Sequence, residues 1–183
     1  MIIGLTGTNA SGKGTVAKYL VEKGYEYHSL SDELRLLLEK RKIPATRENL
    51  IKEGKYYRDE HGRGYLASIV VKKIKGKNVV IDSIRNLGEV NELRKLENFH
   101  LLAIDAPVET RFERAKKRMS SRDQKTFEEF VAKQKEELRG KGSEQQLIAC
   151  MEKADFKIEN DSDLKNLYKK IESTLEKIEN DSE

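Results

Sequence analysis

Apolar and polar positions follow two different periods along the chain. Short apolar runs predict strands at Ile2–Thr6 and at 25–29, 78–82, 100–105 and 156–158. Elsewhere apolar residues recur every three or four positions, which predicts helices at 12–23, 33–41, 87–96, 108–118, 126–138, 144–151 and 163–178. Because strands and helices alternate, the sequence predicts an α/β fold with a five-stranded parallel sheet flanked by helices, the last strand at its edge.

Glycine, proline and polar residues set the predicted boundaries. Ser31 or Asp32 is a suitable N-cap for the helix at 33–41. The segment 47–75 is expected to form helices that are broken near Gly62 and Gly64. The final residues, 179–183, form a polar tail that we expect to be frayed.

The length of 183 residues, with no linker or repeat, predicts one domain over 1–183. No apolar run approaches the roughly 20 residues needed to cross a bilayer, and the first residues lack the pattern of a secretory signal. We therefore expect a cytoplasmic protein with no membrane partner. The single cysteine, Cys150, excludes an internal disulfide and is expected in the core of a helix.

Lysine and arginine outnumber aspartate and glutamate by 36 to 32, which gives a net charge of +4. This balance suits anionic ligands but lacks the basic block with interleaved aromatic residues that is typical of a dedicated nucleic-acid binder. A nucleic acid or protein partner is left open.

The clearest motif, Gly-Thr-Asn-Ala-Ser-Gly-Lys-Gly-Thr, begins directly after the first predicted strand. Two glycines separated by four residues and followed by lysine have the spacing of a P-loop. Such a loop turns its backbone N–H groups toward a phosphate, and the following helix adds a partial positive charge. The predicted phosphate-binding residues are Gly7, Asn9, Ala10, Ser11, Gly12, Lys13, Gly14 and Thr15. The spacing does not fit a dinucleotide-binding Rossmann turn.

The residue after Lys13 is Gly14 rather than the usual serine or threonine, and Thr15 follows. The order Gly-Lys-Gly-Thr resembles that of adenylate kinases and other nucleoside monophosphate kinases. The resemblance implies ATP as phosphate donor and Mg²⁺ held largely through water and phosphate, with Thr15 near it. The chain has no Asn-Lys-x-Asp motif for reading guanine, which also favours a small-molecule kinase over a GTPase.

Two further elements resemble this kinase family. Asp32 and Arg35 stand where the family has Asp-x-x-Arg after the second strand, so both are assigned to acceptor binding. The segment from Asp82 to Arg85 is similar to the family's Asp-Gly-Phe-Pro-Arg, one residue shorter and without its glycine and proline. The resemblance implies that Asp82 organises Mg²⁺ through water and that Arg85 binds the acceptor phosphate.

After the fourth predicted strand, the family has a helix whose arginines stabilise the transferring phosphoryl group. Arg114 and Arg118 are four residues apart and share one face of the predicted helix. The resemblance assigns them to catalysis and Arg122 to the nucleotide. Any lid is very short, at 119–125, while 31–75 forms a helical insert that binds the acceptor.

Residues 80–160 also resemble archaeal nucleotide kinases described as adenylate-kinase-like or dephospho-CoA-kinase-like. The predicted activity is therefore ATP-dependent phosphoryl transfer to a small phosphate-bearing acceptor, such as a ribo- or deoxyribonucleoside monophosphate, with ATP and Mg²⁺. Two alternatives remain open. One is transfer to a hydroxyl, as in dephospho-CoA kinase, with Asp32 as base; the other is an ATPase or nucleotide switch that acts with a protein or RNA.

Overall fold

Five parallel strands form the centre of the molecule. The computed structural model describes residues 1–117 and 126–180, except the side chains of 136 and 137. The sheet has the order β2-β3-β1-β4-β5, and each neighbouring pair is parallel. The strands are β1 (Ile2–Thr6), β2 (Glu26–Ser29), β3 (Val79–Asp82), β4 (Phe99–Asp105) and β5 (Phe156–Glu159). The predicted α/β class and parallel sheet are confirmed.

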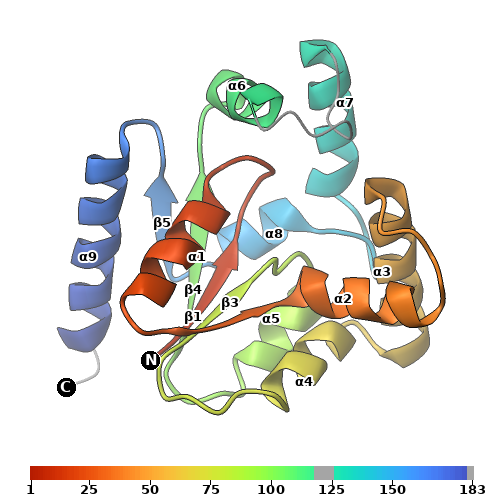
Figure 1. Ribbon diagram of the computed structural model, residues 1–183, viewed down its shortest axis with the longest axis horizontal. Coiled ribbons are helices and arrows are strands. Elements are labelled where there is room, and N and C mark those ends of the chain that lie inside the picture. Colours follow the sequence, from red (N-terminus) through yellow and green to blue (C-terminus); the bar gives the residue numbers. More distant parts are fainter. Residues whose placement is uncertain (118–125, 181–183) are drawn as a thin grey trace.

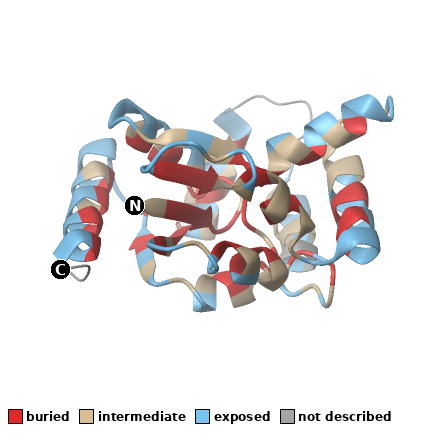
Figure 2. Ribbon diagram, turned by 90° about the horizontal axis from the view of Figure 1, so that it is seen from below, coloured by how far each residue is buried: buried red, intermediate tan, exposed pale blue. Residues whose placement is uncertain are grey.

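One face of the sheet is covered by α1 (Lys13–Glu22) and α9 (Leu164–Asn180) (Figure 1). Apolar residues at helical spacing on α9, including Leu167 and Ile171, pack against Leu102 and Ile104 of β4 and Ile158 of β5. The stripe on the last helix is therefore core packing. Figure 2 shows the strands buried between helices whose outer sides are exposed.

A larger group of helices covers the other face and extends beyond it. They are α2 (Leu30–Lys40), α3 (Arg47–His61), α4 (Tyr65–Val71), α5 (Leu87–Leu93) and α8 (Leu147–Glu152). Gly62 ends α3 with a φ of 96°, so the predicted break in the segment 47–75 is confirmed. Cys150 is fully buried in α8, as expected.

Two helices lie at the carboxyl end of the sheet, near the loop that follows β1 (Figure 1). In α6 (Val108–Lys117) and α7 (Phe127–Leu138), Ala115 and Phe130 pack with Ala10 of that loop. Arg111 of α6 also connects the two helices. It is buried and donates hydrogen bonds to the carbonyl of Ala106 and to the side chain of Gln134 on α7.

Several boundaries differ from the sequence expectation. Helix α2 begins at Leu30, and its N-cap is Ser29, whose Oγ accepts a hydrogen bond from the backbone N–H of Asp32. The predicted caps Ser31 and Asp32 were wrong, because extended backbone already ends at Ser29. Helix α9 continues to Asn180, two residues further than expected. Among the described residues, no helix is long and apolar enough to cross a membrane.

Candidate active site

Close backbone contacts shape the loop that follows β1. Gly7 has a φ of 134°, and a Cβ there would lie 1.9 Å from the carbonyl oxygen of Ile104. Gly12 has a φ of 105°, and its Cβ would lie 2.2 Å from Nδ2 of Asn160. Both glycines therefore combine a left-handed conformation with a neighbour that excludes a side chain. The helix begins at once, since the N–H groups of Thr15 and Val16 donate to the carbonyl of Gly12.

Lys13 lies across this loop. Its Nζ donates hydrogen bonds to the carbonyl oxygens of Gly7, at 2.8 Å, and Thr8, at 2.7 Å. Nearby, Ser11 is fully buried, and its Oγ has no hydrogen-bond partner among the described residues. A lysine, a buried hydroxyl and a helix N-terminus around a curled backbone fit the phosphate groups of a nucleotide.

Side chains from the ends of two strands hold the loop in place. The Thr8 hydroxyl donates to Oδ1 of Asp105 at 2.6 Å, and the Asn160 side chain donates to the carbonyl of Ser11 at 2.8 Å. The backbone N–H of Asn160 in turn donates to the carbonyl of Asp105. Sequence reasoning missed both anchors: Asp105 ends a predicted strand and could have been considered, whereas no motif marks Asn160.

Arg114 contacts the same corner of the loop. Its guanidinium donates to the backbone carbonyl of Asn160 at 3.0 Å and makes longer contacts, at 3.4 Å, with Oδ1 of Asn160 and the carbonyl of Ser11. The structure thus places this predicted catalytic residue beside the loop. Arg118, Arg122 and the predicted lid at 119–125 lie outside the described residues.

Asp82 ends β3, which pairs directly with β1, so its carboxylate lies at the same edge of the sheet as the loop. It accepts a hydrogen bond from the N–H of Ser83 at 2.6 Å. Ser83 has a φ of 68°, a left-handed conformation at the position where the resembling kinases have glycine. No group of three His, Cys, Asp or Glu residues in the described part could hold a metal ion. Coordination by Asp82 through water, and by Thr15, stays a prediction.

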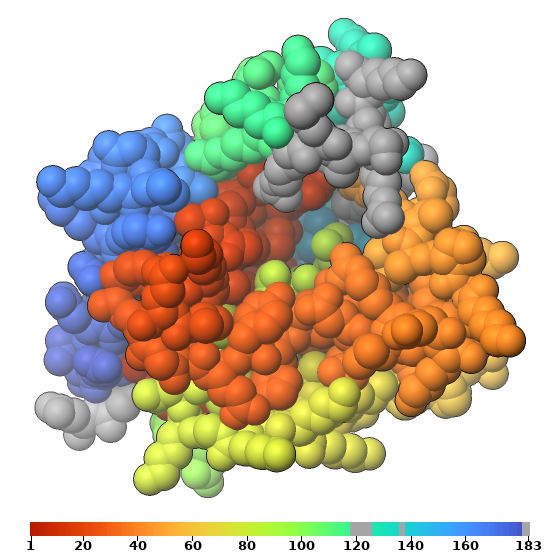
Figure 3. Space-filling view, in the orientation of Figure 1, coloured from red at the N-terminus to blue at the C-terminus, as the bar shows by residue number. Residues whose placement is uncertain are grey.

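A pocket of about 230 Å³ opens beside the loop. In Figure 3 the yellow-green residues after β3 lie recessed between the red-to-orange segments of the loop and α2 and the orange α3. The predicted residues Arg35 and Arg85 line this pocket, together with Asn9. Asp32 is not in the lining but orients Arg35, which donates to its Oδ1 at 2.7 Å and to Ser31 at 2.9 Å. The sequence did not single out four further polar lining residues: Arg47, Arg58, Glu89 and Gln145.

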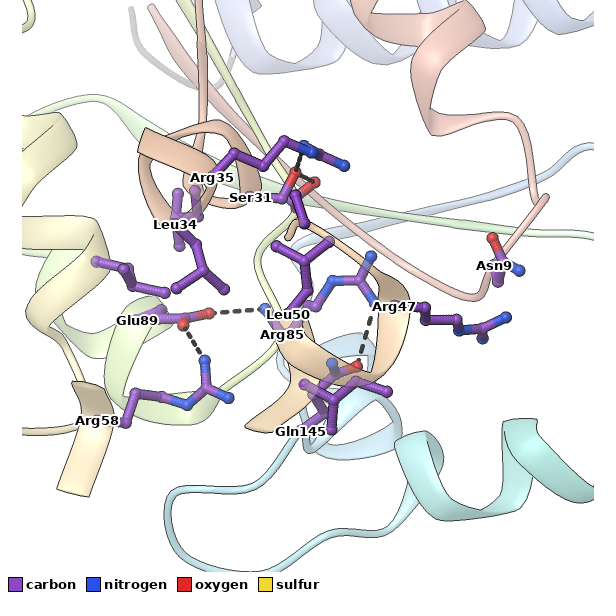
Figure 4. Close-up of a pocket in the computed structure, with 15 residues that line it drawn as sticks. Asn9, Ser31, Leu34, Arg35, Arg47, Leu50, Arg58, Arg85, Glu89 and Gln145 are labelled. Carbon is purple, nitrogen blue, oxygen red and sulfur yellow. Dashed lines mark hydrogen bonds and ion pairs between the residues drawn. The ribbon is translucent and has the colours of Figure 1, made fainter. Parts of the chain in front are cut away.

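The floor of the pocket contains a buried ion pair (Figure 4). Arg58 and Glu89 are 4% and 1% exposed, and Nη1 of Arg58 lies 3.1 Å from Oε1 of Glu89. The other carboxylate oxygen of Glu89 accepts the N–H groups of Arg85 and Asn86. Burial raises the pKa of Glu89, and the Arg58 charge and these hydrogen bonds oppose that rise. Glu89 therefore fixes the backbone that carries Arg85.

The buried cysteine, Cys150, is not suited to act as a nucleophile. Burial raises the pKa of the Cys150 thiol to about 12, so it remains protonated near neutral pH. A protonated thiol is a poor nucleophile.

Comparison with known proteins agrees with this geometry. Residues 3–140 match the family model described as AAA domain. A UPF0200 protein of Pyrococcus abyssi is 40% identical, and a UPF0200 protein of Pyrococcus horikoshii 38% identical; each match covers 97% of both chains. The chain belongs to the UPF0200 family. These two matches cover nearly the whole UPF0200 chain, so the loop and the pocket lie within the shared region.

Solved structures show which fold the UPF0200 chain has. Shikimate kinase from Aquifex aeolicus superposes with a TM-score of 0.58 at 19% identity and 96% coverage of both chains. The protein TT1252 from Thermus thermophilus gives a TM-score of 0.63 at 20% identity and 97% coverage of both. The UPF0200 chain therefore has the fold of P-loop kinases. Together with the match of residues 3–140 to the AAA domain model, this confirms the sequence-based assignment to a P-loop kinase-like superfamily.

Proposed function

We propose that this protein transfers the γ-phosphoryl group of ATP to a small phosphate-bearing acceptor, a ribo- or deoxyribonucleoside monophosphate. In this reaction an acceptor phosphate oxygen bonds to the γ-phosphorus while the bond to the β–γ bridging oxygen breaks, and ADP leaves. The observation that carries the proposal is a pocket rich in arginine directly beside a P-loop. Phosphoryl transfer depends mainly on positioning and on cations that balance the charge.

The donor half is the loop 7–15. Its N–H groups and Lys13 would bind the β- and γ-phosphates, for which Lys13 exchanges its hydrogen bonds to Gly7 and Thr8. Mg²⁺ supplies charge neutralisation when bound, and Asp82, through water, with Thr15 would hold it. Arg114, next to the loop, would balance charge that develops on the transferred group.

The acceptor half is the pocket. Arg35, Arg47, Arg58 and Arg85 line it, against a single lining carboxylate, Glu89, which already pairs with Arg58. This excess of cations favours an anionic acceptor. A phosphate nucleophile is already ionised and needs no general base, so the pocket requires no free carboxylate.

A hydroxyl acceptor would need such a base, and Asp32 is the residue that the sequence offers. In the structure its Oδ1 accepts a hydrogen bond from Arg35, and its side chain is not part of the pocket lining. This arrangement supports a role for Asp32 in orienting Arg35. The dephospho-CoA-kinase-like alternative therefore ranks below transfer to a phosphate.

Two arginine-to-methionine variants test the acceptor half. Arg35→Met and Arg85→Met each remove charge-assisted hydrogen bonds to the acceptor phosphate, so we expect the KM for the acceptor to rise about 10- to 100-fold. Lys169→Met, on the exposed side of α9, is the matched control for loss of a positive charge. Steady-state kinetics with saturating Mg-ATP measure the effect.

Unchanged acceptor KM in both arginine variants would contradict the assignment of the pocket. A large fall in rate for Asp32→Asn with dephospho-CoA, and no transfer to any monophosphate, would favour the hydroxyl acceptor instead. Slow hydrolysis of ATP that is stimulated only by an added protein or RNA would favour the third possibility, an ATPase or nucleotide switch.

A further inference from the structure

The pocket has two chemically different ends. Figure 4 shows Asn9 and Arg47 at one end and Arg58, Glu89 and Leu34 at the other. The first end adjoins the P-loop, because Asn9 belongs to it. The acceptor phosphate must lie at that end to receive the γ-phosphoryl group. The far end must then contact the part of the acceptor most distant from its phosphate.

Apolar side chains make up part of the pocket lining. The apolar lining residues come from α2, α3, α4 and the connection between α2 and α3: Leu30, Leu34, Ala45, Leu50, Ile51 and Leu66. Such walls suit the faces of a flat ring, as in ligand sites that combine apolar contact with a few fixed polar groups.

Arg58 is the hydrogen-bond donor at the far end, beside Glu89, and two hydrogen bonds hold it in place. Its Nε donates to the carbonyl of Ser143 at 2.6 Å, and its Nη1 pairs with Glu89. Its Nη2 makes no hydrogen bond to another described residue, although the side chain is only 4% exposed. A guanidinium can only donate. Arg58 lines the pocket beside Glu89 (Figure 4), so an N–H donor held in a fixed position lies at its far end.

We propose that Arg58 reads the nucleobase of the acceptor by donating a hydrogen bond from Nη2 to a ring carbonyl oxygen. This inference rests on the proposed function and gives it a substrate class: nucleoside monophosphates whose base carries a carbonyl, namely cytosine, uracil, thymine or guanine. Adenine has an amino group in place of such an oxygen, so AMP is a poorer phosphoryl acceptor. A site built to hydrogen-bond one group discriminates strongly against the analogue that lacks it.

The other polar side chains of the lining leave this role to Arg58, and Gln145 lies beside Arg85 rather than at the far end (Figure 4). Its side-chain oxygen accepts a hydrogen bond from Arg85, which leaves its amide N–H₂ as a further donor in the pocket lining. Glu89 offers little competition as an acceptor, since its two oxygens already receive three hydrogen bonds. Arg58 is therefore the polar group left to bind a ligand at the far end, and as a donor it matches an oxygen atom on the ligand.

The experiment compares CMP, UMP, dTMP, GMP, AMP and ribose 5-phosphate with the wild-type protein and Arg58→Lys. Lysine keeps the charge beside Glu89, but its single nitrogen cannot reach Glu89, Ser143 and a ligand together. We expect a carbonyl-bearing monophosphate to be the best acceptor. Arg58→Lys should lower kcat/KM for it about 10- to 100-fold, while that for ribose 5-phosphate, which has no base, changes less than threefold.

The matched control is Lys52→Gln, which removes a charge from the exposed side of the same helix and should leave the acceptor ranking unchanged. Thermal unfolding of both variants checks the fold. AMP as best acceptor, or an equal loss for ribose 5-phosphate, would overturn the role of Arg58 while leaving the kinase intact. Failure of the wild-type protein to phosphorylate any of these compounds would overturn the proposed function itself.

Discussion

At the scale of single residues, Asn160 is the contact that best explains how the P-loop keeps its shape. Its side chain donates to the carbonyl of Ser11 and occupies the space that a Cβ on Gly12 would need. Its backbone carbonyl also receives Arg114. Through its side chain and its backbone, Asn160 therefore connects the P-loop, the end of β5 and Arg114, the predicted catalytic arginine.

The variant Asn160→Asp tests this role, because it keeps the shape but removes the donor. A carboxylate beside the Ser11 carbonyl leaves two acceptors facing each other, so we expect the Kd for ATP to rise about tenfold and unfolding to cost about 1–3 kcal/mol less. Fluorescence titration with an ATP analogue and chemical denaturation measure the two effects. Asn166→Asp, an exposed position at the start of α9, is the matched control. Unchanged ATP affinity in Asn160→Asp would remove Asn160 from the site.

These residues also mark the limit of what the sequence could predict. Lys13, Arg35 and Arg85 were found because each lies in a short motif, and the structure places all three at the loop or the pocket. Asn160 contacts a residue 149 positions away, and Arg58 lies on a charged helix where no motif distinguishes it. Such contacts depend on how elements pack, which no local pattern contains.

At the scale of elements, the loop 7–15 and helix α1 form one unit, and its glycines differ in why the structure accepts or requires them. Gly12 is required by its φ of 105° and by Asn160. Gly14, in the first turn of α1, has open space around the position of a Cβ and no left-handed conformation. The motif thus contains two glycines that the fold needs, Gly7 and Gly12, and one that it tolerates, Gly14.

The pair Gly12→Ala and Gly14→Ala separates these two cases by stability. Gly12→Ala places a side chain in the left-handed region and against Asn160, and we expect a loss of at least about 1–2 kcal/mol. Gly14→Ala fills open space in a helix, where alanine is favoured over glycine by about 0.5–1 kcal/mol, so its stability should be equal or higher. Denaturant unfolding of the free protein measures both. Equal stabilities would contradict the close contact at Gly12.

The boundaries of helices and strands could be predicted where the local sequence pattern was distinctive. The residues of β1 were predicted without error because a buried run ends at the first P-loop glycine. The start of α2 was wrong by three residues, because Ser29, Ser31 and Asp32 all suit an N-cap and only pairing of β2 with β3 decides among them. Helix α8 begins later than predicted, at Leu147, since Asn86 binds the carbonyls of Gly142 and Glu144 and holds that segment as a loop.

At the scale of the whole molecule, the fold places two sites at one edge of the sheet. The P-loop follows the central strand β1, and the pocket lies between the ends of the neighbouring strands and the helices of segment 30–71. Ligands of open α/β sheets bind at this carboxyl edge. Under the proposed function, this arrangement would bring ATP and the anionic acceptor together, as transfer between two phosphates requires.

The most direct test of this account follows the γ-phosphoryl group itself. The protein is incubated with Mg²⁺ and γ-labelled ATP and each ribo- and deoxyribonucleoside monophosphate in turn, with dephospho-CoA added to the panel, and labelled products are separated. Lys13→Ala is the inactive reference, and Lys18→Ala, exposed on the same helix, is its control. We predict that label appears in one class of nucleoside diphosphate and that Lys13→Ala abolishes it. Label found only in inorganic phosphate, at a rate independent of every acceptor, would contradict the proposed kinase.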